Sequence, residues 1–265
     1  MNCHSTAVIH EATRLADDVT IGPYAVIEDG VQIGSGTIIR EHAIIRSGTV
    51  LGSGCVVDAH TVLGGLPQDL SFDPKTPSGV RIGKNVTFRE GVTVNRATFE
   101  GQFTEIGDNC FFMATSHVGH DCKVGNNVIL ANAVLLAGKV TVGDHTFIGG
   151  SAAVHQFCRV GESSMIGGIA RVAQDMPPFC IMAERNELVG LNLIGLKRRG
   201  FSRDTIKELK HLYHLIYGVD GRPRVLAEAA LKDGVAKSPE GKQFLEFMAA
   251  ESSKQVMRPR GGREG

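Results

Sequence analysis

The sequence contains no tryptophan, and only 6% of its 265 residues are aromatic, which argues against a core built from large aromatic side chains. Neither sign of charge is in excess, because 28 Lys and Arg residues balance 28 Asp and Glu residues. This balance argues against a general nucleic-acid-binding protein, which is expected to be basic. Glycine is abundant instead, with 33 residues, and this suits a structure with many tight corners.

The chain also lacks the segments that direct proteins into or across membranes. No stretch approaches the roughly 18 uninterrupted apolar residues of a transmembrane helix, so we expect no transmembrane segment. The first ten residues show no basic region followed by an apolar run, and no secretory signal is visible. We therefore expect a cytoplasmic protein whose cysteines are reduced.

A six-residue repeat of large apolar residues runs through most of the chain. Twelve consecutive positions at this spacing are apolar between Ile106 and Val172, and ten more between Ile9 and Leu63. A helix repeats every 3.6 residues and a simple strand every two, so neither explains a period of six. The residue four places after each apolar position is small or β-branched almost throughout. Such a hexapeptide repeat is the signature of a parallel β-helix with one short strand per repeat.

The cysteines follow this repeat and are not arranged for metal or redox chemistry. No C-x-x-C pair occurs, which argues against a zinc ribbon or a redox-active pair. Four cysteines occupy the small-residue position, and we expect them to be buried core residues: Cys55, Cys110, Cys122 and Cys158.

Two interruptions of the repeat predict loops that project from the coil. Residues 64–79 are rich in Pro and Gly and lose the period, and a shorter interruption covers about residues 97–105. Between them the repeat resumes at Ile82, Phe88 and Val94, one residue out of phase. Loops as long as the first are usually functional or disordered.

The repeat ends at Met176-Pro177-Pro178, because proline cannot continue a hydrogen-bonded ladder. We predict a β-helix over residues 1–185 and a helical C-terminal domain over residues 186–253. Its first helix is expected near Leu188 to Arg199, and later helices are expected to open at Ser202, Pro223 and Ser238. Residues 254–265 are basic and Gly-rich, and we predict a disordered tail.

Proteins with this repeat, which the chain resembles, place three hexapeptides in each turn, so that residue n stacks on residue n+18. The 25 repeat positions then make a little over eight turns, about 40 Å long at about 4.8 Å per turn. This register puts His120 beneath Gly138 and Gly138 beneath Gln156, with Lys139 and His155 on the same side. Polar side chains beside a bare glycine indicate a place where a ligand approaches the backbone.

Three interpretations of His120 remain open from the residues alone. Imidazole exchanges protons near neutral pH, so His120 is a candidate general base, and the adjacent Asp121 is a candidate to orient it. An ordinary surface histidine is the second interpretation. A zinc site with His117 and His155 is the third, but these two lie two turns apart and no further carboxylate pattern supports a metal.

A basic cluster in the helical region is the other charged feature of the chain. It comprises Lys197, Arg198, Arg199, Lys207, Lys210, His211 and His214. The cluster fits a solvated helix end, where cations favour the helix dipole. It fits equally a docking surface for an acidic partner or a phosphate.

Several longer motifs make the chain similar to one family in particular. They are His117-Val118-Gly119-His120-Asp121-Cys122, Leu130-Ala131-Asn132, Ala153-Val154-His155-Gln156-Phe157, Val172-Ala173-Gln174-Asp175-Met176-Pro177-Pro178, Gly195-Leu196-Lys197-Arg198-Arg199-Gly200-Phe201 and Pro67-Gln68-Asp69-Leu70. With them, nearly the whole chain resembles the bacterial acyl-[acyl-carrier-protein]–UDP-N-acetylglucosamine O-acyltransferases, which begin lipid A synthesis.

The resemblance implies a mostly β protein, a left-handed parallel β-helix followed by a small α-helical C-terminal domain. It implies a homotrimer with active sites between subunits. The implied reaction transfers a 3-hydroxyacyl chain from acyl carrier protein to the 3-hydroxyl of UDP-N-acetylglucosamine, without a metal or a bound cofactor. His120 would be the general base with Asp121 beside it, and the Gly138 N–H would stabilise the oxyanion. The acidic carrier protein would be a partner for the basic cluster.

The resemblance also implies which other residues contact the substrates. Those that would bind substrate are Gln68, Asp69, His117, Lys139, His155, Gln156, Asn192 and Arg198. Gly168, with Met165 nearby, would limit the acyl chain, and a Gly there implies that a longer chain is admitted. The chain departs from well-known members at Lys139, where they have His, and at Ile194, where they have Glu. Ile194 cannot accept a hydrogen bond from a nucleotide.

Three alternative functions are weighed against this one. The first is a hexapeptide-repeat acyltransferase that acts on a sugar amine. The enzyme of that kind in the same pathway carries an extra N-terminal domain, whereas here the repeat begins at residue 9. The second is a zinc hydratase of the γ-carbonic-anhydrase type. The third is a non-catalytic scaffold, which leaves the alignment of His120, Gly138 and Gln156 unexplained.

Overall fold

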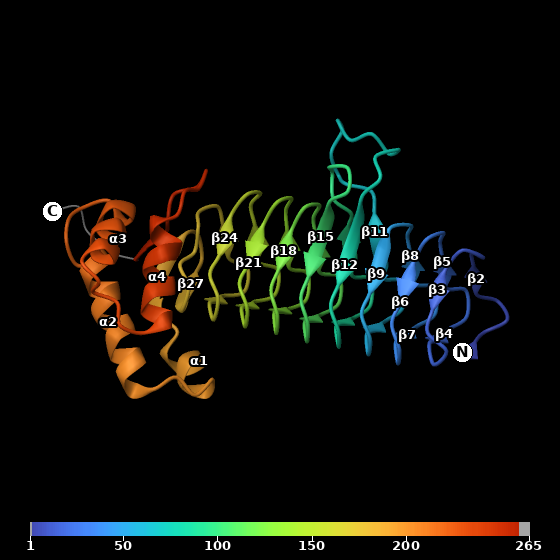
Figure 1. The fold of residues 1–265 in the computed structure, drawn as a ribbon, viewed down its shortest axis with the longest axis horizontal. Coiled ribbons are helices and arrows are strands. Elements are labelled where there is room, and N and C mark those ends of the chain that lie inside the picture. The colour runs from blue at the N-terminus through green and yellow to red at the C-terminus, as the bar shows by residue number, and fades with distance from the viewer. Residues whose placement is uncertain (1, 260–265) are drawn as a thin grey trace.

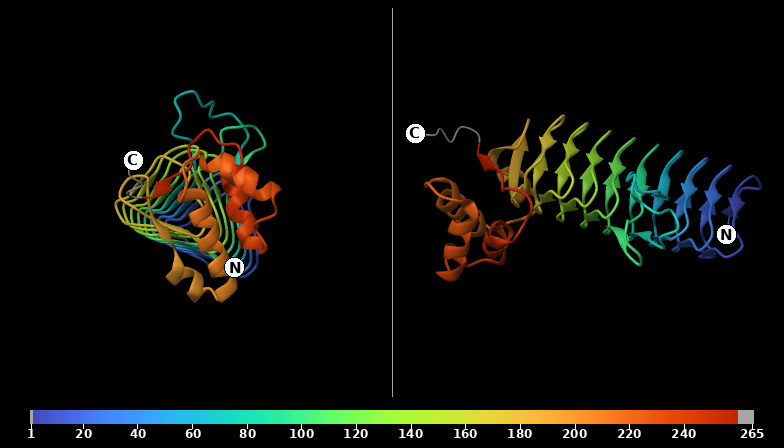
Figure 2. Two further views of the ribbon diagram at one scale, coloured as in Figure 1. Left: turned by 90° about the vertical axis from the view of Figure 1, so that its left-hand side faces the viewer. Right: turned by 90° about the horizontal axis from the view of Figure 1, so that it is seen from above.

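The computed structural model describes residues 2–259, which form a long prism followed by a small group of helices (Figure 1). Each turn of the prism gives one short strand to each of three parallel sheets, and Figure 2 shows the coil along its axis. Among the described residues the sheets hold twelve, nine and eight strands. The prediction of a left-handed parallel β-helix followed by a small helical domain is confirmed.

Most strands are only two residues long. The twelve-stranded sheet contains β1 Asn2–Cys3, β4 Thr20–Ile21, β7 Ile38–Ile39, β10 Val56–Val57, β13 Thr87–Phe88, β16 Phe111–Phe112, β19 Ile129–Leu130, β22 Phe147–Ile148, β25 Met165–Ile166, β27 Cys180–Ala183, β28 Glu187–Leu191 and β29 Arg258–Pro259. The nine-stranded sheet contains β2 Val8–Ile9, β5 Val26–Ile27, β8 Ile44–Ile45, β11 Val62–Gly65, β14 Thr93–Asn95, β17 His117–Val118, β20 Leu135–Leu136, β23 Ala153–Val154 and β26 Arg171–Val172. The eight-stranded sheet contains β3 Arg14–Leu15, β6 Gln32–Ile33, β9 Thr49–Leu51, β12 Gly79–Ile82, β15 Phe103–Ile106, β18 Lys123–Val124, β21 Thr141–Val142 and β24 Arg159–Val160.

The register between turns explains the six-residue repeat. Val118 stacks on Leu136, 18 residues later, and both side chains are fully buried because each hexapeptide turns its large apolar residue inward. The predicted buried cysteines occupy the corners, where Cys55, Cys110, Cys122 and Cys158 are at most 1% exposed and form no disulfide. From Asn109 to Ile169, every sixth residue has a positive φ, which turns the next corner.

Two insertions leave the prism on the same side (Figure 1). The first, residues 66–78, joins β11 to β12, and the second, residues 96–102, joins β14 to β15. The second is shorter than the predicted segment 97–105, because Phe103–Glu105 already pairs with β12. The insertions pack together, since the Arg96 side chain donates to the Pro74 carbonyl and lies over the Phe72 ring.

The helical domain contains α1 Leu193–Arg198, α2 Arg203–Tyr217, α3 Pro223–Lys232 and α4 Pro239–Ala249. The predicted openings at Ser202, Pro223 and Ser238 are confirmed, and both serine hydroxyls accept a hydrogen bond from the first turn of their helix. None of the helices within residues 2–259 combines the length and the apolar character that crossing a membrane requires.

The prediction of a helix from Leu188 is wrong. Glu187–Leu191 forms β28, which runs antiparallel to β27, and the helix begins only at Leu193. The chain reverses between these strands because Glu184 and Asn186 both adopt positive φ.

The prediction of a disordered tail is wrong for residues 254–259. Arg258–Pro259 forms β29 beside β28, and the Met257 side chain is fully buried. The Met257 N–H donates to the Asp175 carbonyl, and the Tyr217 hydroxyl donates to the Met257 carbonyl. Burial of the Met257 side chain and these hydrogen bonds keep the segment ordered, although its composition is mostly polar. Residues 260–265 of the predicted tail lie outside the described residues.

The order of this segment yields a prediction. Met257→Ala is expected to lower the free energy of unfolding by about 2–5 kcal/mol, because it empties a fully buried site between the tail and the helices. Chemical denaturation measures the change. The exposed neighbour Gln255 is the control, since Gln255→Ala is expected to change stability by at most about 0.5 kcal/mol. Equal stability of the two variants would contradict the packing of this segment.

Candidate active site

A groove of about 830 Å³ runs along the outer face of the nine-stranded sheet. Gln68 from the first insertion lines one part of it, and Arg185 from the turn between β27 and β28 lines another. Its floor is a row of outward-facing residues that stack from turn to turn: His117, Leu135, Ala153 and Arg171. His120, Gly138, His155 and Gln156 line the neighbouring corner, so the groove brings together six of the thirteen site residues that the sequence predicts.

His120 and Asp121 form the central pair of this site. His120 Nδ1 lies 2.7 Å from Asp121 Oδ2, and the two side chains are only 16% and 13% exposed. Neighbours on a regular strand point to opposite faces, but Asp121 is a corner residue with φ 59°, and this conformation turns its carboxylate toward the ring. Because a carboxylate only accepts hydrogen bonds, the neutral imidazole carries its proton on Nδ1 and keeps a lone pair on Nε2.

The second insertion holds the Asp121 carboxylate in place. The Thr98 N–H and hydroxyl donate to its two oxygens at 2.9 and 2.6 Å, and the Asp121 N–H donates to Thr104 Oγ1 at 2.9 Å. Burial disfavours the charged carboxylate, but the hydrogen bonds from Thr98 and His120 outweigh it and hold the pKa of Asp121 below its ordinary value. Asp121 therefore stays ionised and fixes the orientation of the His120 ring.

Gly138 lies against the His120 ring, as the 18-residue register predicts. A Cβ added at Gly138 would come within 2.4 Å of His120 Nε2 and 2.5 Å of Cε1, so only glycine fits beneath this ring. Among the described residues, none accepts a hydrogen bond from the Gly138 N–H. A free backbone donor therefore lies beside the nitrogen that can act as a base.

Of the predicted binding residues around this pair, His117 lies in the floor of the groove, Gln156 lies at its corner, and Asp69 lies next to Gln68. His117 Nδ1 is 2.8 Å from the Thr93 hydroxyl, and Gln156 is exposed two turns beyond His120. Asp69 accepts hydrogen bonds from Ser71, which lower the pKa of its carboxyl, and the positive charge of Lys139 lowers it further. The first insertion therefore approaches the site.

Lys139 does not line the groove. Its ammonium group lies 5.0 Å from the centre of the Phe99 ring and 5.4 Å from that of Phe157, so two exposed aromatic rings hold it by cation–π attraction.

Four further predicted residues lie away from this groove within one chain. Asn192 caps α1 by accepting from the Gly195 N–H, and its amide donates to the Ser163 carbonyl. Arg198 is exposed in the last turn of α1. Met165 and Gly168 lie on or after β25 in the twelve-stranded sheet.

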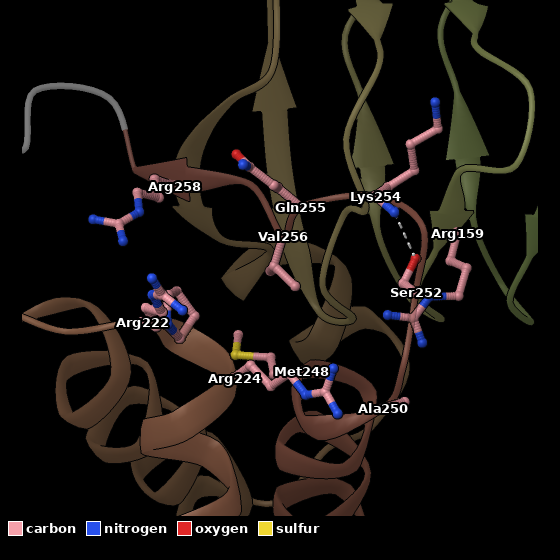
Figure 3. A pocket seen from close by; sticks show the side chains of 11 residues that line it. Arg159, Arg222, Arg224, Met248, Ala250, Ser252, Lys254, Gln255, Val256 and Arg258 are labelled. Carbon is pink, nitrogen blue, oxygen red and sulfur yellow. Dashed lines mark hydrogen bonds between the residues drawn. The ribbon is translucent and has the colours of Figure 1, made fainter.

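A second hollow, of about 520 Å³, lies between the helical domain and the C-terminal segment (Figure 3). Its lining is rich in cations and includes Arg159, Arg222, Arg224, Lys254 and Arg258. The Lys254 ammonium lies 3.3 Å from His155 Nδ1, so this segment reaches the edge of the main groove. The hollow holds no histidine or carboxylate in its lining that could act as a base.

The site also contains residues that the sequence reasoning missed. Thr98 and Thr104 hold Asp121, Thr93 contacts His117, and Arg171 and Arg185 line the groove. The n+18 rule applied to His117 leads through Leu135 and Ala153 to Arg171. Thr98 and Arg185 depend on the paths of an insertion and a turn, which no repeat predicts. Within residues 2–259 of one chain, no group of three or more His, Cys, Asp or Glu side chains converges as a metal site.

Known sequences and structures match this chain along most of its length. The family described as Udp N-acetylglucosamine O-acyltransferase, domain 2, matches residues 175–258, and bacterial transferase hexapeptide repeats match residues 12–47 and 103–138. An acyl-[acyl-carrier-protein]–UDP-N-acetylglucosamine O-acyltransferase of Anaeromyxobacter dehalogenans is 47% identical over 251 residues, which cover 94% of this chain and 96% of the relative. One from Aliarcobacter butzleri is 48% identical over 84% of this chain and 85% of the relative.

The fold agrees with the same family. The structure of UDP-N-acetylglucosamine acyltransferase from Campylobacter jejuni matches with a TM-score of 0.90 and 38% identity, covering 98% of this chain and 100% of that one. The enzyme from Francisella novicida matches with a TM-score of 0.89 and 33% identity over 98% and 95% of the two chains. Sequence, repeat and fold together show that this chain is an acyltransferase and belongs to the acyl-[acyl-carrier-protein]–UDP-N-acetylglucosamine O-acyltransferase family.

Proposed function

We propose that this chain transfers a 3-hydroxyacyl group from acyl carrier protein to the 3-hydroxyl of UDP-N-acetylglucosamine, the first step of lipid A synthesis. The names of its relatives include both substrates, acyl-[acyl-carrier-protein] and UDP-N-acetylglucosamine. The observation that supports the chemistry in this chain is the His120 ring, oriented by an ionised Asp121 and packed against the bare backbone of Gly138.

The proposed reaction begins with proton transfer from the sugar 3-hydroxyl to His120 Nε2. The sugar oxygen then attacks the thioester carbonyl carbon, and the carbonyl electrons move to oxygen, where the Gly138 N–H donates a hydrogen bond to the oxyanion. Collapse of this intermediate breaks the carbon–sulfur bond, and the imidazolium returns its proton to the departing thiolate. The Asp121 carboxylate stabilises the imidazolium meanwhile. A thioester is already activated, so this sequence requires neither a metal nor a cofactor.

The sugar nucleotide is proposed to lie along the groove. Gln68, Asp69 and His117 surround the sugar, and His155 and Gln156 lie further toward the helical domain. Asn192 and Arg198 lie away from this groove within one chain, so they are proposed to reach the nucleotide from a neighbouring subunit of a homotrimer. Well-known family members have a histidine at the position of Lys139, which can offer a hydrogen bond. Lys139, whose ammonium group lies near the rings of Phe99 and Phe157, is proposed to contribute positive charge near the phosphates instead. The enzyme is proposed to work in the cytoplasm.

The acidic acyl carrier protein is proposed to dock on the basic surface of the helical domain. The basic cluster defined above and the cationic hollow of Figure 3 both belong to this end of the molecule. Charge attraction at such a surface raises the rate of encounter and weakens with salt.

His120→Ala tests the proposed base. The variant is expected to fold normally and to reduce kcat by about a hundredfold or more, because it removes the imidazole that Asp121 orients beside Gly138. Transfer from 3-hydroxyacyl carrier protein to UDP-N-acetylglucosamine is the measured reaction. His42→Ala is the control, since His42 is an exposed corner residue far along the prism, and it should leave kcat unchanged. Near-normal activity of His120→Ala would contradict the mechanism.

The protonation of His117 gives a second prediction. Burial, aided by the charge of nearby His120, lowers the pKa of His117. We therefore expect His117 to be neutral at pH 7 and to titrate below its ordinary value of about 6.5 in an NMR pH titration. His117→Gln assigns the resonance. A midpoint at or above about 6.5 would show that the site does not exclude water from this ring as the structure indicates.

The predicted role of Gly168 in limiting the length of the acyl chain gives a third prediction. Gly168→Met is expected to shift preference toward shorter acyl donors, because the added side chain occupies space that distal methylenes would fill. Each methylene lost from apolar contact costs about 0.8 kcal/mol, or roughly fourfold in kcat/KM. Competition between carrier proteins with chains of different length measures the shift, and the shortest donor serves as the internal control. An unchanged ranking of donors would remove Gly168 from the acyl channel.

A further inference from the structure

Arg171 and Arg185 differ from the other arginines of the prism. They face each other across one turn in a parallel bridge, and the Arg171 N–H donates to the Glu184 carbonyl at 2.7 Å. Both are exposed, and both line the groove that contains His120. Within residues 2–259, no carboxylate lies at ion-pair distance from either guanidinium.

Most other arginines of the prism lie beside a carboxylate, although Arg14 and Arg96 have no ion pair among the described residues. Five arginines pair with an acidic side chain on an adjacent turn: Arg40 and Arg89 with Asp58, Arg46 with Glu28, Arg81 with Glu105 and Arg159 with Asp175. Like charges directly opposite each other on neighbouring strands are destabilising. A stacked pair of arginines without a carboxylate therefore indicates a place where an anion from outside the chain binds.

The cationic hollow of Figure 3 lacks this property. There Arg159 pairs with Asp175, and Arg224 pairs with Glu228 and Glu251. Two of its five cations therefore have a carboxylate partner, whereas neither Arg171 nor Arg185 has one at ion-pair distance among the described residues.

The backbone beneath the pair is firmly held. Arg185 is the middle residue of the turn between β27 and β28, flanked by Glu184 and Asn186 with φ of 55° and 53°. The Ala173 N–H donates to Asn186 Oδ1 at 2.6 Å and ties this turn to the end of β26. The arginines thus stand on a fixed backbone, and only their side chains need to adjust around a ligand.

The position of the pair identifies the anion. Arg171 lies three turns beyond His117 in the same row, or about 14 Å at about 4.8 Å per turn. A sugar at His120 directs the phosphates of its nucleotide along this groove. We propose that Arg171 and Arg185 bind the diphosphate of the nucleotide sugar, an inference that rests on the proposed function.

Calorimetric titration of the full-length protein with UDP-N-acetylglucosamine tests this assignment. Arg171→Met and Arg185→Met are each expected to raise Kd by about tenfold or more, since each removes a charge-assisted contact to phosphate. The effect should be as large for UDP and absent for uridine. Arg14→Met is the matched control, because Arg14 is also exposed and without an ion pair among the described residues but lies on the eight-stranded sheet. Its Kd should stay within twofold of the wild-type value.

The remaining outcomes are separable. If the wild-type protein neither binds nor acylates UDP-N-acetylglucosamine, the proposed function fails and this inference fails with it. If the wild type binds and both variants retain its Kd, the inference alone is overturned. A raised KM for acyl carrier protein with unchanged nucleotide Kd would assign the pair to the carrier protein instead. A less stable oligomer with unchanged Kd would assign it to a subunit contact, and either result overturns the diphosphate site.

Discussion

The parallel ladder between successive turns is the constraint on which the rest of this structure depends. Each strand is too short to be stable alone, and its hydrogen bonds and its buried residue exist only because the next turn lies 18 residues on. A slip of one residue would turn every apolar side chain outward, so the register is strongly specified. The same register sets His120 against Gly138 and places Gln156 one turn further. One constraint thus builds both the core and the site.

The site also depends on departures from the regular ladder. The left-handed corner at Asp121 lets two consecutive side chains meet, which a regular strand would prevent. The second insertion supplies Thr98 to hold the carboxylate, and the first brings Gln68 to the groove. Regular turns therefore provide position, and irregular segments provide the orientation and the surroundings of the base.

The period of six predicts the strands and the buried cysteines. The stacking of His120, Gly138 and Gln156 also requires three hexapeptides per turn, which the resemblance to other hexapeptide-repeat proteins implies, and every turn then repeats that register. Features set by single, unrepeated contacts escaped prediction. The apolar spacing of Glu187–Leu191 fits a helix as well as a strand, and the positive φ values at Glu184 and Asn186 decide for the strand. The order of residues 254–259 comes from Met257 and its partners, which composition does not reveal. The turn at residues 184–186 also places Arg185 opposite Arg171.

A crystal structure of this protein with UDP-N-acetylglucosamine bound tests the central claim most directly, that the stacked turns assemble the acyl-transfer site. The account predicts that the sugar 3-hydroxyl lies within hydrogen-bond distance of His120 Nε2, beside the Gly138 N–H, with His120 Nδ1 still donating to Asp121. A sugar bound elsewhere, with the His120 ring facing only solvent, would contradict it.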